Sequence, residues 1–274
     1  MSAIAIPHGA SRGSWFALRA VGNETAKGIA LMWRRRATLA MGTATSGVMY
    51  LMIQFFIGAG HINHAVLAVT LPGLAAYAVA STAALSGAGG IAEEVNGGTL
   101  EQAHLSPARP SLLALGRVGA LAAEGLLPAV ALAAAYWAGF GVHYTIRPDA
   151  LVPLLLMIAD ALAYALVMTA LVLRMASIGA VVHVFNMAVM FLGGMFVPVS
   201  VFPRGVEIFA RFLPTTLGTE VLNTTLAGRG LGAAWSDGTL PWLLVHAAVV
   251  SGLGWAAYLA TLRRARREGG LGPR

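Results

Sequence analysis

Long apolar runs alternate with short polar connectors along most of the chain. Six of these runs approach or exceed the ~20 mainly apolar residues that a helix needs to cross a bilayer. They cover residues 37–59, 65–86, 111–140, 150–173, 177–199 and 239–262. The first run is long and begins far from the start of the chain, so we expect it to remain as a helix and not to be a cleaved signal peptide. The pattern predicts an all-α polytopic membrane protein with a six-span transmembrane domain over residues 37–262.

The segment ahead of the first run has the periodicity of an amphipathic helix. In residues 14–36 the apolar residues recur every three or four positions, which places them on one helical face. They are Trp15, Leu18, Gly22, Ala26, Ile29 and Trp33. The pattern predicts that residues 1–36 form a cytoplasmic leader whose helix lies in the membrane interface.

A second patterned stretch, residues 200–228, lies between the fifth and sixth runs. Pro203 and Pro214 interrupt it, and Glu207 stands four residues before Arg211, in the favourable order for a helical ion pair. We expect two short external helices, hinged at Pro214, that re-enter the outer leaflet with their backbone groups paired internally.

Composition excludes several classes of protein. The 274 residues are 58% hydrophobic and 11% charged, and the mean hydropathy is +0.75, whereas a soluble domain carries about 25% charged residues. An ordinary cytosolic enzyme is therefore disfavoured. The net charge of +7 comes from basic clusters that abut apolar runs, such as Arg34–Arg36. This placement is typical of topology determinants and not of a nucleic-acid-binding face.

The distribution of basic residues predicts the orientation. Both ends of the chain are basic, so the leader and the tail, 263–274, are expected in the cytoplasm of a bacterial cell, with the spans in its inner membrane. The connector 87–110 is then cytoplasmic, and 200–238 is external.

Several chemistries lack the residues that they need. The chain has no Cys, and its single lysine, Lys27, does not stand in a phosphate-binding Gly-Lys-Ser/Thr sequence. His61 and His64 lack the companions of a metal site. Glu93 and Glu94 resemble the glutamate pair of intramembrane CAAX-type proteases, but Gly98 stands where that family has an Arg. We expect no catalytic residue, no metal site and no cofactor on this chain.

The cytoplasmic connector carries the most informative motif. An acidic residue is followed by Gly-Thr-Leu-Glu-Gln and then by a proline, ahead of the third run. These residues are Glu94, Gly98, Thr99, Leu100, Glu101, Gln102 and Pro107. The motif resembles the permease subunits of the ABC type-2 exporters. On the residues alone, an ordinary solvated connector is the favoured reading, and the alternative is a short helix that Thr99 caps.

A second motif supports the same resemblance. The end of the fifth run and the stretch after it combine small residues, an aromatic residue, spaced prolines and a glutamate. The matching residues are Phe196, Pro198, Pro203, Pro214 and Glu220. The resemblance covers nearly the whole chain. It implies that the connector docks on a separate ATPase subunit, which binds ATP and Mg²⁺, and that the permease works with a second copy or a related permease.

Polar residues within the runs are candidates for a substrate path. Ionisable groups are costly inside a membrane and often functional. We place on the path or its gate Gln54, Glu124, Asp160, His183, Asn186, Phe196, Pro198, Phe209, Phe212, Pro214 and Glu220. Structural contacts between helices are the alternative for the buried polar members. Arg117 lies near the cytoplasmic end of the third run, where its side chain is expected to snorkel.

The resemblance therefore implies the permease of an exporter, and we expect it to move an amphiphilic small molecule, drug or lipid outward. The alternative is an ATP-independent, proton-coupled secondary transporter that uses Glu124, Asp160 and His183 as a proton path. An intramembrane enzyme is disfavoured by the missing motifs.

Overall fold

The computed structural model describes residues 14–97, 109–142, 144, 147–174 and 179–267. All regular secondary structure within these ranges is helical. The elements are α1 (Ser14–Arg34), α2 (Arg36–Ile57), α3 (His64–Asn96), α5 (Pro110–Phe140), η1 (Pro148–Ala150), α6 (Leu151–Arg174), α7 (Gly179–Leu192), η2 (Val199–Val201), α8 (Arg204–Ala210), α9 (Thr216–Leu226), α10 (Gly230–Ser236) and α11 (Thr239–Arg267). The predicted all-helical class is confirmed for these ranges.

Five helices are long and apolar enough to cross a membrane. They cover Arg36–Ile57, His64–Glu94, Pro110–Phe140, Pro148–Val172 and Thr239–Arg264. The fifth predicted run, 177–199, contains only the shorter apolar helix α7, which ends at Leu192. Gly194, two residues beyond that end, has a φ of +86°, a left-handed conformation that glycine adopts without strain. The chain is thus a multi-pass membrane protein, and the count of six spans stays a prediction.

Helix α3 extends ten residues beyond the apolar run that predicted it. The run ends at residue 86, whereas the helix continues to Asn96. Ile91 is fully buried in this extension. Glu93 pairs with Arg35, which lies between α1 and α2, and Glu94 pairs with Arg117 of α5. These contacts explain why the helix continues into the residues that were expected to form a connector.

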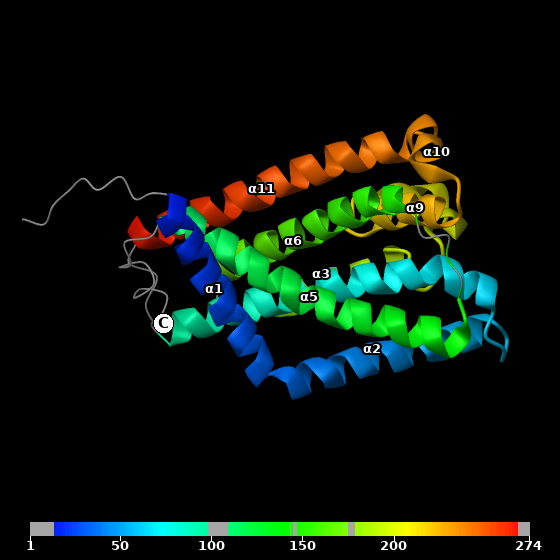
Figure 1. Ribbon diagram of the computed structural model, residues 1–274, viewed down its shortest axis with the longest axis horizontal. Coiled ribbons are helices and arrows are strands. Elements are labelled where there is room, and N and C mark those ends of the chain that lie inside the picture. Colours follow the sequence, from blue (N-terminus) through cyan, green and yellow to red (C-terminus); the bar gives the residue numbers. More distant parts are fainter. Residues whose placement is uncertain (1–13, 98–108, 143, 145–146, 175–178, 268–274) are drawn as a thin grey trace, which may run out of the picture.

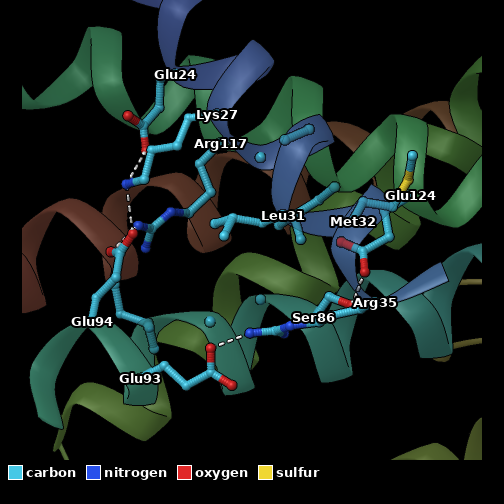
Figure 2. Close-up of a pocket in the computed structure, with 16 residues that line it drawn as sticks. Glu24, Lys27, Leu31, Met32, Arg35, Ser86, Glu93, Glu94, Arg117 and Glu124 are labelled. Carbon is cyan, nitrogen blue, oxygen red and sulfur yellow. Dashed lines mark hydrogen bonds and ion pairs between the residues drawn. The ribbon is translucent and has the colours of Figure 1, made fainter. Parts of the chain in front are cut away.

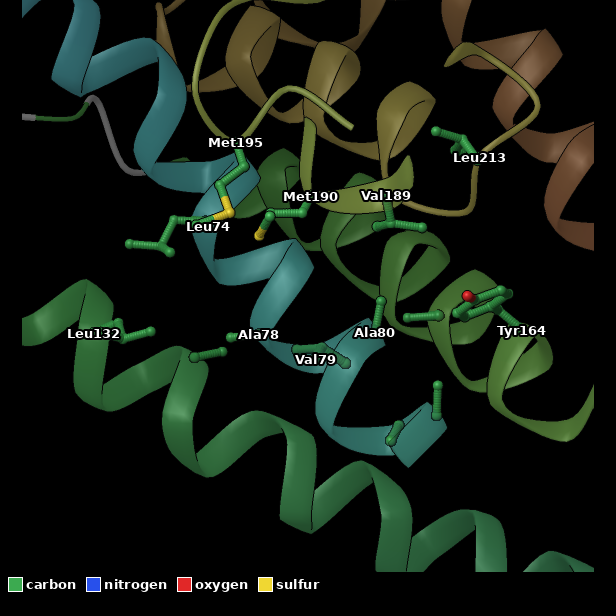
Figure 3. Packing of buried hydrophobic residues seen from close by; sticks show 14 of the residues in the cluster. Leu74, Ala78, Val79, Ala80, Leu132, Tyr164, Val189, Met190, Met195 and Leu213 are labelled. Carbon is green, nitrogen blue, oxygen red and sulfur yellow. The ribbon is translucent and has the colours of Figure 1, made fainter. Parts of the chain in front are cut away.

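Figure 1 shows a bundle in which α3 lies between α5 and α6, and α11 covers the other side of α6. The pairing of α6 with α11 is the most extensive in the described structure. Helix α2 lies at the edge of the bundle and touches its neighbours much less. The core between α3, α5, α6 and α7 is filled by residues such as Leu74, Val79, Leu132 and Val189 (Figure 3).

Helix α1 crosses one end of the bundle and packs on α5 (Figure 1). Small residues allow the close approach: a Cβ on Gly28 would clash with Ala120, and one on Gly116 would lie 2.6 Å from the Cβ of Glu24. Trp15 and Trp33, on the apolar face, are 74% and 62% exposed. The predicted amphipathic helix is confirmed, its apolar face points away from the bundle, and its place in the membrane interface stays a prediction.

The opposite end of the bundle carries the short helices that follow α7. Helices α8 and α9 are separated by residues 211–215, which include Pro214, and α10 follows as a helix that the sequence pattern did not predict. Helix α9 is largely buried against α3, α6 and α11, whereas most of α8 is exposed. The two short helices and the break at Pro214 are confirmed, and their re-entry into a leaflet stays a prediction.

Candidate functional site

A cluster of four charged side chains joins α1, α3 and α5 (Figure 2). Glu94, near the end of α3, accepts a hydrogen bond of 2.9 Å from Lys27 Nζ of α1 and forms an ion pair with Arg117 of α5. Lys27 also lies 3.4 Å from Glu24 Oε1. The Arg117 guanidinium donates to the hydroxyl oxygen of Tyr258, 3.4 Å away on α11. Glu94 thus stands where four helices meet.

Burial gives these ion pairs more weight than a surface pair. The side chains of Arg117 and Glu94 are 15% and 16% exposed, so water screens their charges less than on an open surface. Burial disfavours the charged form of Lys27, but its hydrogen bond to Glu94 and the negative charge there outweigh this effect, and the pKa of Lys27 is raised. Loss of Glu94 would leave two partly buried cations without their common counter-ion.

Of the predicted coupling residues, only Glu94 lies within the described ranges. The rest of the motif, Gly98, Thr99, Leu100, Glu101, Gln102 and Pro107, lies outside them. The sequence reading missed the partners of Glu94. Arg117 was expected to snorkel, yet it points to Glu94. Lys27 was considered only for a phosphate-binding sequence, which it does not fit.

Next to this cluster, one polar cavity lies between α1, α3 and α5, and a second lies between α2, α3 and α5. One, of about 330 Å³, lies against Glu24, Lys27 and Glu94 and reaches Glu124. A second, of about 350 Å³, extends from Glu124 along hydroxyl-bearing residues. These are Thr38, Thr43, Ser46, Ser81, Thr82 and Ser86. Ser86 donates a hydrogen bond of 2.8 Å to the Glu124 carboxylate. The predicted path residue Glu124 therefore lines a real polar cavity.

Asp160 of α6 is buried against His246 of α11. Asp160 Oδ2 lies 2.7 Å from His246 Nδ1, and His246 Nε2 lies 3.1 Å from the carbonyl oxygen of Phe212. A carbonyl only accepts, so Nε2 carries the hydrogen, and the Nδ1–Oδ2 contact then needs a second proton shared between acid and imidazole. The pair is neutral overall and ties two spans to the segment between α8 and α9.

The three residues of the expected proton path are not brought together. Glu124 bonds to Ser86 and Asp160 bonds to His246, whereas His183 on α7 is exposed. The sequence reading missed His246 because it stands singly in an apolar run, 86 residues from its partner. No pattern of local spacing could have revealed the pair.

Gln54 and Phe196 belong to one buried network near the end of the bundle opposite α1. Gln54 Nε2 donates to the Phe196 carbonyl oxygen at 2.9 Å and to Thr70 Oγ1 at 3.2 Å. The Tyr50 hydroxyl lies 2.7 Å from the same Thr70 oxygen, and the Tyr50 ring stacks on Phe196. These contacts link α2 and α3 to the chain that follows α7.

Pro72 interrupts α3 near this network. It lacks an amide hydrogen, so the carbonyl of Ala68, four residues earlier, loses its helical partner. The Tyr144 hydroxyl donates to that carbonyl at 2.9 Å. Asn223 Nδ2 of α9 donates to the neighbouring carbonyl of Val69 at 2.8 Å. Helix α9 is thereby held to α3 at the point where Pro72 interrupts the helical hydrogen-bond pattern of α3.

The remaining gate candidates differ in burial. Phe209 and Phe212 are 55% and 61% exposed, whereas Pro214 is buried and Pro198 partly buried. Arg211 lies 2.9 Å from Glu207 and 3.6 Å from Glu220 and so connects α8 with α9. Burial raises the pKa of Glu220, and the charge of Arg211 counteracts this in part.

Asn186 of α7 is buried, and neither side-chain atom has a hydrogen-bond partner within the described structure. Within the same ranges, no three His, Asp or Glu side chains gather into a set able to hold a metal ion.

These features define a class: a helical multi-pass membrane protein whose polar groups gather at the junctions and cavities between its helices. The family model of the ABC-2 type transporters matches residues 22–226. The chain therefore belongs to the ABC-2 type transporter family and is the membrane domain of an ABC-type transporter, a transport subunit. No curated protein matches it.

Proposed function

We propose that the chain is the permease subunit of an exporter that moves an amphiphilic molecule outward. Separate ATPase subunits, which bind ATP and Mg²⁺, drive it, and a second copy or a related permease completes the membrane part. The observation that carries this proposal is the junction at Glu94. It ties the end of α3 to α1 and α5 directly before the motif residues 98–107.

The junction supports a simple coupling mechanism. An ATPase that docks on the motif displaces the end of α3 when it closes on ATP. Glu94 passes the displacement to α1 through Lys27 and to α5 through Arg117. Because α1 and α5 cross with so little space between them, they move together. Both line the cavity that reaches Glu124.

The remaining parts of the proposal concern topology and the gate. The chain lies in the bacterial inner membrane with six spans and both ends in the cytoplasm, as its basic ends support. Helices α8 and α9 lie at the outer end, where Phe209, Phe212, Pro214 and Glu220 form a gate. Gln54 and Phe196 hold the inner side of that gate closed through their hydrogen bond.

Substitution of Glu94 tests the coupling role. The chain is purified from its native membrane with its partners, which should include an ATPase. The Glu94→Ala and Glu94→Gln variants should lower transport and ATPase stimulation at least tenfold, because a broken buried ion pair costs roughly 3–5 kcal/mol. The adjacent Glu93→Ala is the matched control, since the Glu93 side chain is 65% exposed.

Two outcomes would contradict the proposal. One is that no ATPase copurifies with the chain from its native membrane and the chain still transports. The other is normal coupling in both Glu94 variants, with membrane insertion confirmed by their recovery in the membrane fraction.

A further inference from the structure

Glu124 differs from the other carboxylates that line the cavities near α1. Lys27 pairs with Glu24 and Glu94, Arg117 also pairs with Glu94, and Arg35 pairs with Glu93. The three cations of the lining are thus each held by a carboxylate of α1 or α3.

Glu124 is the carboxylate that remains. Its one hydrogen bond among the described residues comes from Ser86, a neutral hydroxyl. Arg35 lies close enough to act on it through space, but the Arg35 guanidinium is directed to Glu93 (Figure 2). An acid within a membrane span that lacks a direct cationic partner is energetically costly. The cavity against α1 is lined by four carboxylates and three cations, so with Glu124 ionised its lining carries one excess negative charge.

The surroundings of Glu124 complement a positive group. The polar cavity offers hydroxyls as hydrogen-bond acceptors, and the aromatic residue Tyr77 also lines it. Arg35 lines it too, but its charge is paired with Glu93. Aromatic faces attract cations, more strongly when water is excluded. An anionic group would be repelled by the same carboxylate.

An apolar groove adjoins the polar cavity. Its volume is about 680 Å³, and α1, α2 and α5 form its walls. It shares Leu39, Thr43, Pro128 and Leu132 with the polar cavity, and its other lining residues are mostly apolar, such as Leu127 and Ala131. Each of the two spaces falls within the range of a pocket for a drug-sized molecule, about 300–1,000 Å³.

We propose that the connected cavities between α2, α3 and α5 bind a cationic amphiphile. Glu124 holds the positively charged head, the hydroxyls of Ser86 and its neighbours solvate that head, and the apolar body lies along Leu127 and Ala131. The inference deepens the proposed function, since it takes this molecule as the class of substrate that the exporter moves. Binding itself requires no ATPase.

The test uses two probes of matched shape and opposite charge, tetraphenylphosphonium and tetraphenylborate. Binding to the purified full-length chain is measured by equilibrium dialysis, with empty detergent micelles subtracted. The wild-type chain should bind tetraphenylphosphonium at least tenfold more tightly than tetraphenylborate. Glu124→Gln keeps the size and the acceptor for Ser86 but removes the charge, so it should weaken tetraphenylphosphonium binding at least tenfold.

Two further variants sharpen the result. Glu207→Gln, which removes an ion-paired carboxylate on α8, is the matched control and should bind as the wild type does. Thr43→Cys places a thiol in the lining of both spaces of a chain that has no cysteine. Tetraphenylphosphonium should slow its labelling by a maleimide, and should not do so when Glu124→Gln is added.

Equal binding of tetraphenylphosphonium by the wild type and Glu124→Gln would overturn the inference. So would equally tight binding of both probes, or no binding of the cation by the wild type. Because these measurements omit the ATPase, they are independent of the proposed function. Charge-selective binding without ATPase coupling would support the binding site and refute the proposed exporter function. Normal ATPase coupling without charge-selective binding would support the exporter function and refute the binding site.

Discussion

The buried pair of Asp160 and His246 illustrates how a single residue depends on a distant one. Asp160 is fully buried in α6, in a span that otherwise offers an acid little solvation. His246 supplies a partner from α11, and the Phe212 carbonyl fixes which ring nitrogen carries the hydrogen. The pair thereby gives a partner to one oxygen of the acid and to a backbone carbonyl at once, whereas Asp160 Oδ1 has no hydrogen-bond partner among the described residues.

Removal of His246 should destabilise the protein strongly. In His246→Ala, Asp160 and the Phe212 carbonyl both lose their partner, and breaking a buried pair costs roughly 3–5 kcal/mol. Thermal unfolding of the purified protein in detergent should show a clearly lowered midpoint temperature. His183→Ala, which alters an exposed histidine, should change the midpoint little. Equal midpoints for the two variants would show that the pair contributes no stability.

At this scale the sequence indicated costly residues but not their partners. Asp160, Glu124 and Gln54 stood out because polar groups are rare inside apolar runs. Their respective partners, His246, Ser86 and Thr70, come from other helices. A single sequence does not show which helices touch. Arg117 was misread for the same reason, because Glu94 lies on α3.

At the scale of elements, the apolar pattern predicted the existence of the helices better than their ends. Helix α3 continues past its apolar run because ion pairs and the buried Ile91 sustain it. Helix α7 stops before its apolar run does, close to the left-handed Gly194. The apolar pattern reports what lipid or core can cover, whereas backbone conformation and tertiary contacts decide where a helix ends.

The exposed helix α8 provides a prediction at this scale. If α8 belongs to the gate, a bifunctional maleimide that joins two copies through Phe209→Cys should reduce export several-fold and leave ATPase binding intact. The physical reason is that Arg211 connects α8 to α9, so a fixed α8 restrains both. The exposed Trp235→Cys on α10 serves as the control for crosslinking. Complete crosslinking at Phe209→Cys with full export would exclude a gating role.

At the scale of the whole molecule, the two ends of the bundle differ in character. One end carries α1, the Glu94 junction and the basic end of α11, whereas the other carries α8, α9 and α10 (Figure 1). The positive-inside rule predicts that the first end faces the cytoplasm.

Reporter fusions test this orientation. After Arg267, only a reporter that works in the cytoplasm should be active. Near Trp235, only a reporter that works outside the cytoplasm should be active. The physical reason is that the basic clusters resist translocation. Enzymatic activity of paired cytoplasmic and external reporters in intact cells measures both. An external reporter signal after Arg267 would refute the orientation and remove the coupling motif from the reach of any cytosolic ATPase.

The pairing of α6 with α11 has a consequence for biosynthesis. A ribosome delivers Asp160 to the membrane 86 residues before His246, and an aspartate at the centre of a span costs about 2.5–3.5 kcal/mol on insertion scales. The nascent chain must therefore carry an unpaired acid until α11 arrives. Premature termination before α11 would leave Asp160 of α6 without its partner. We expect such an unpaired acid in a span to let the quality-control machinery of the cell recognise the incomplete bundle.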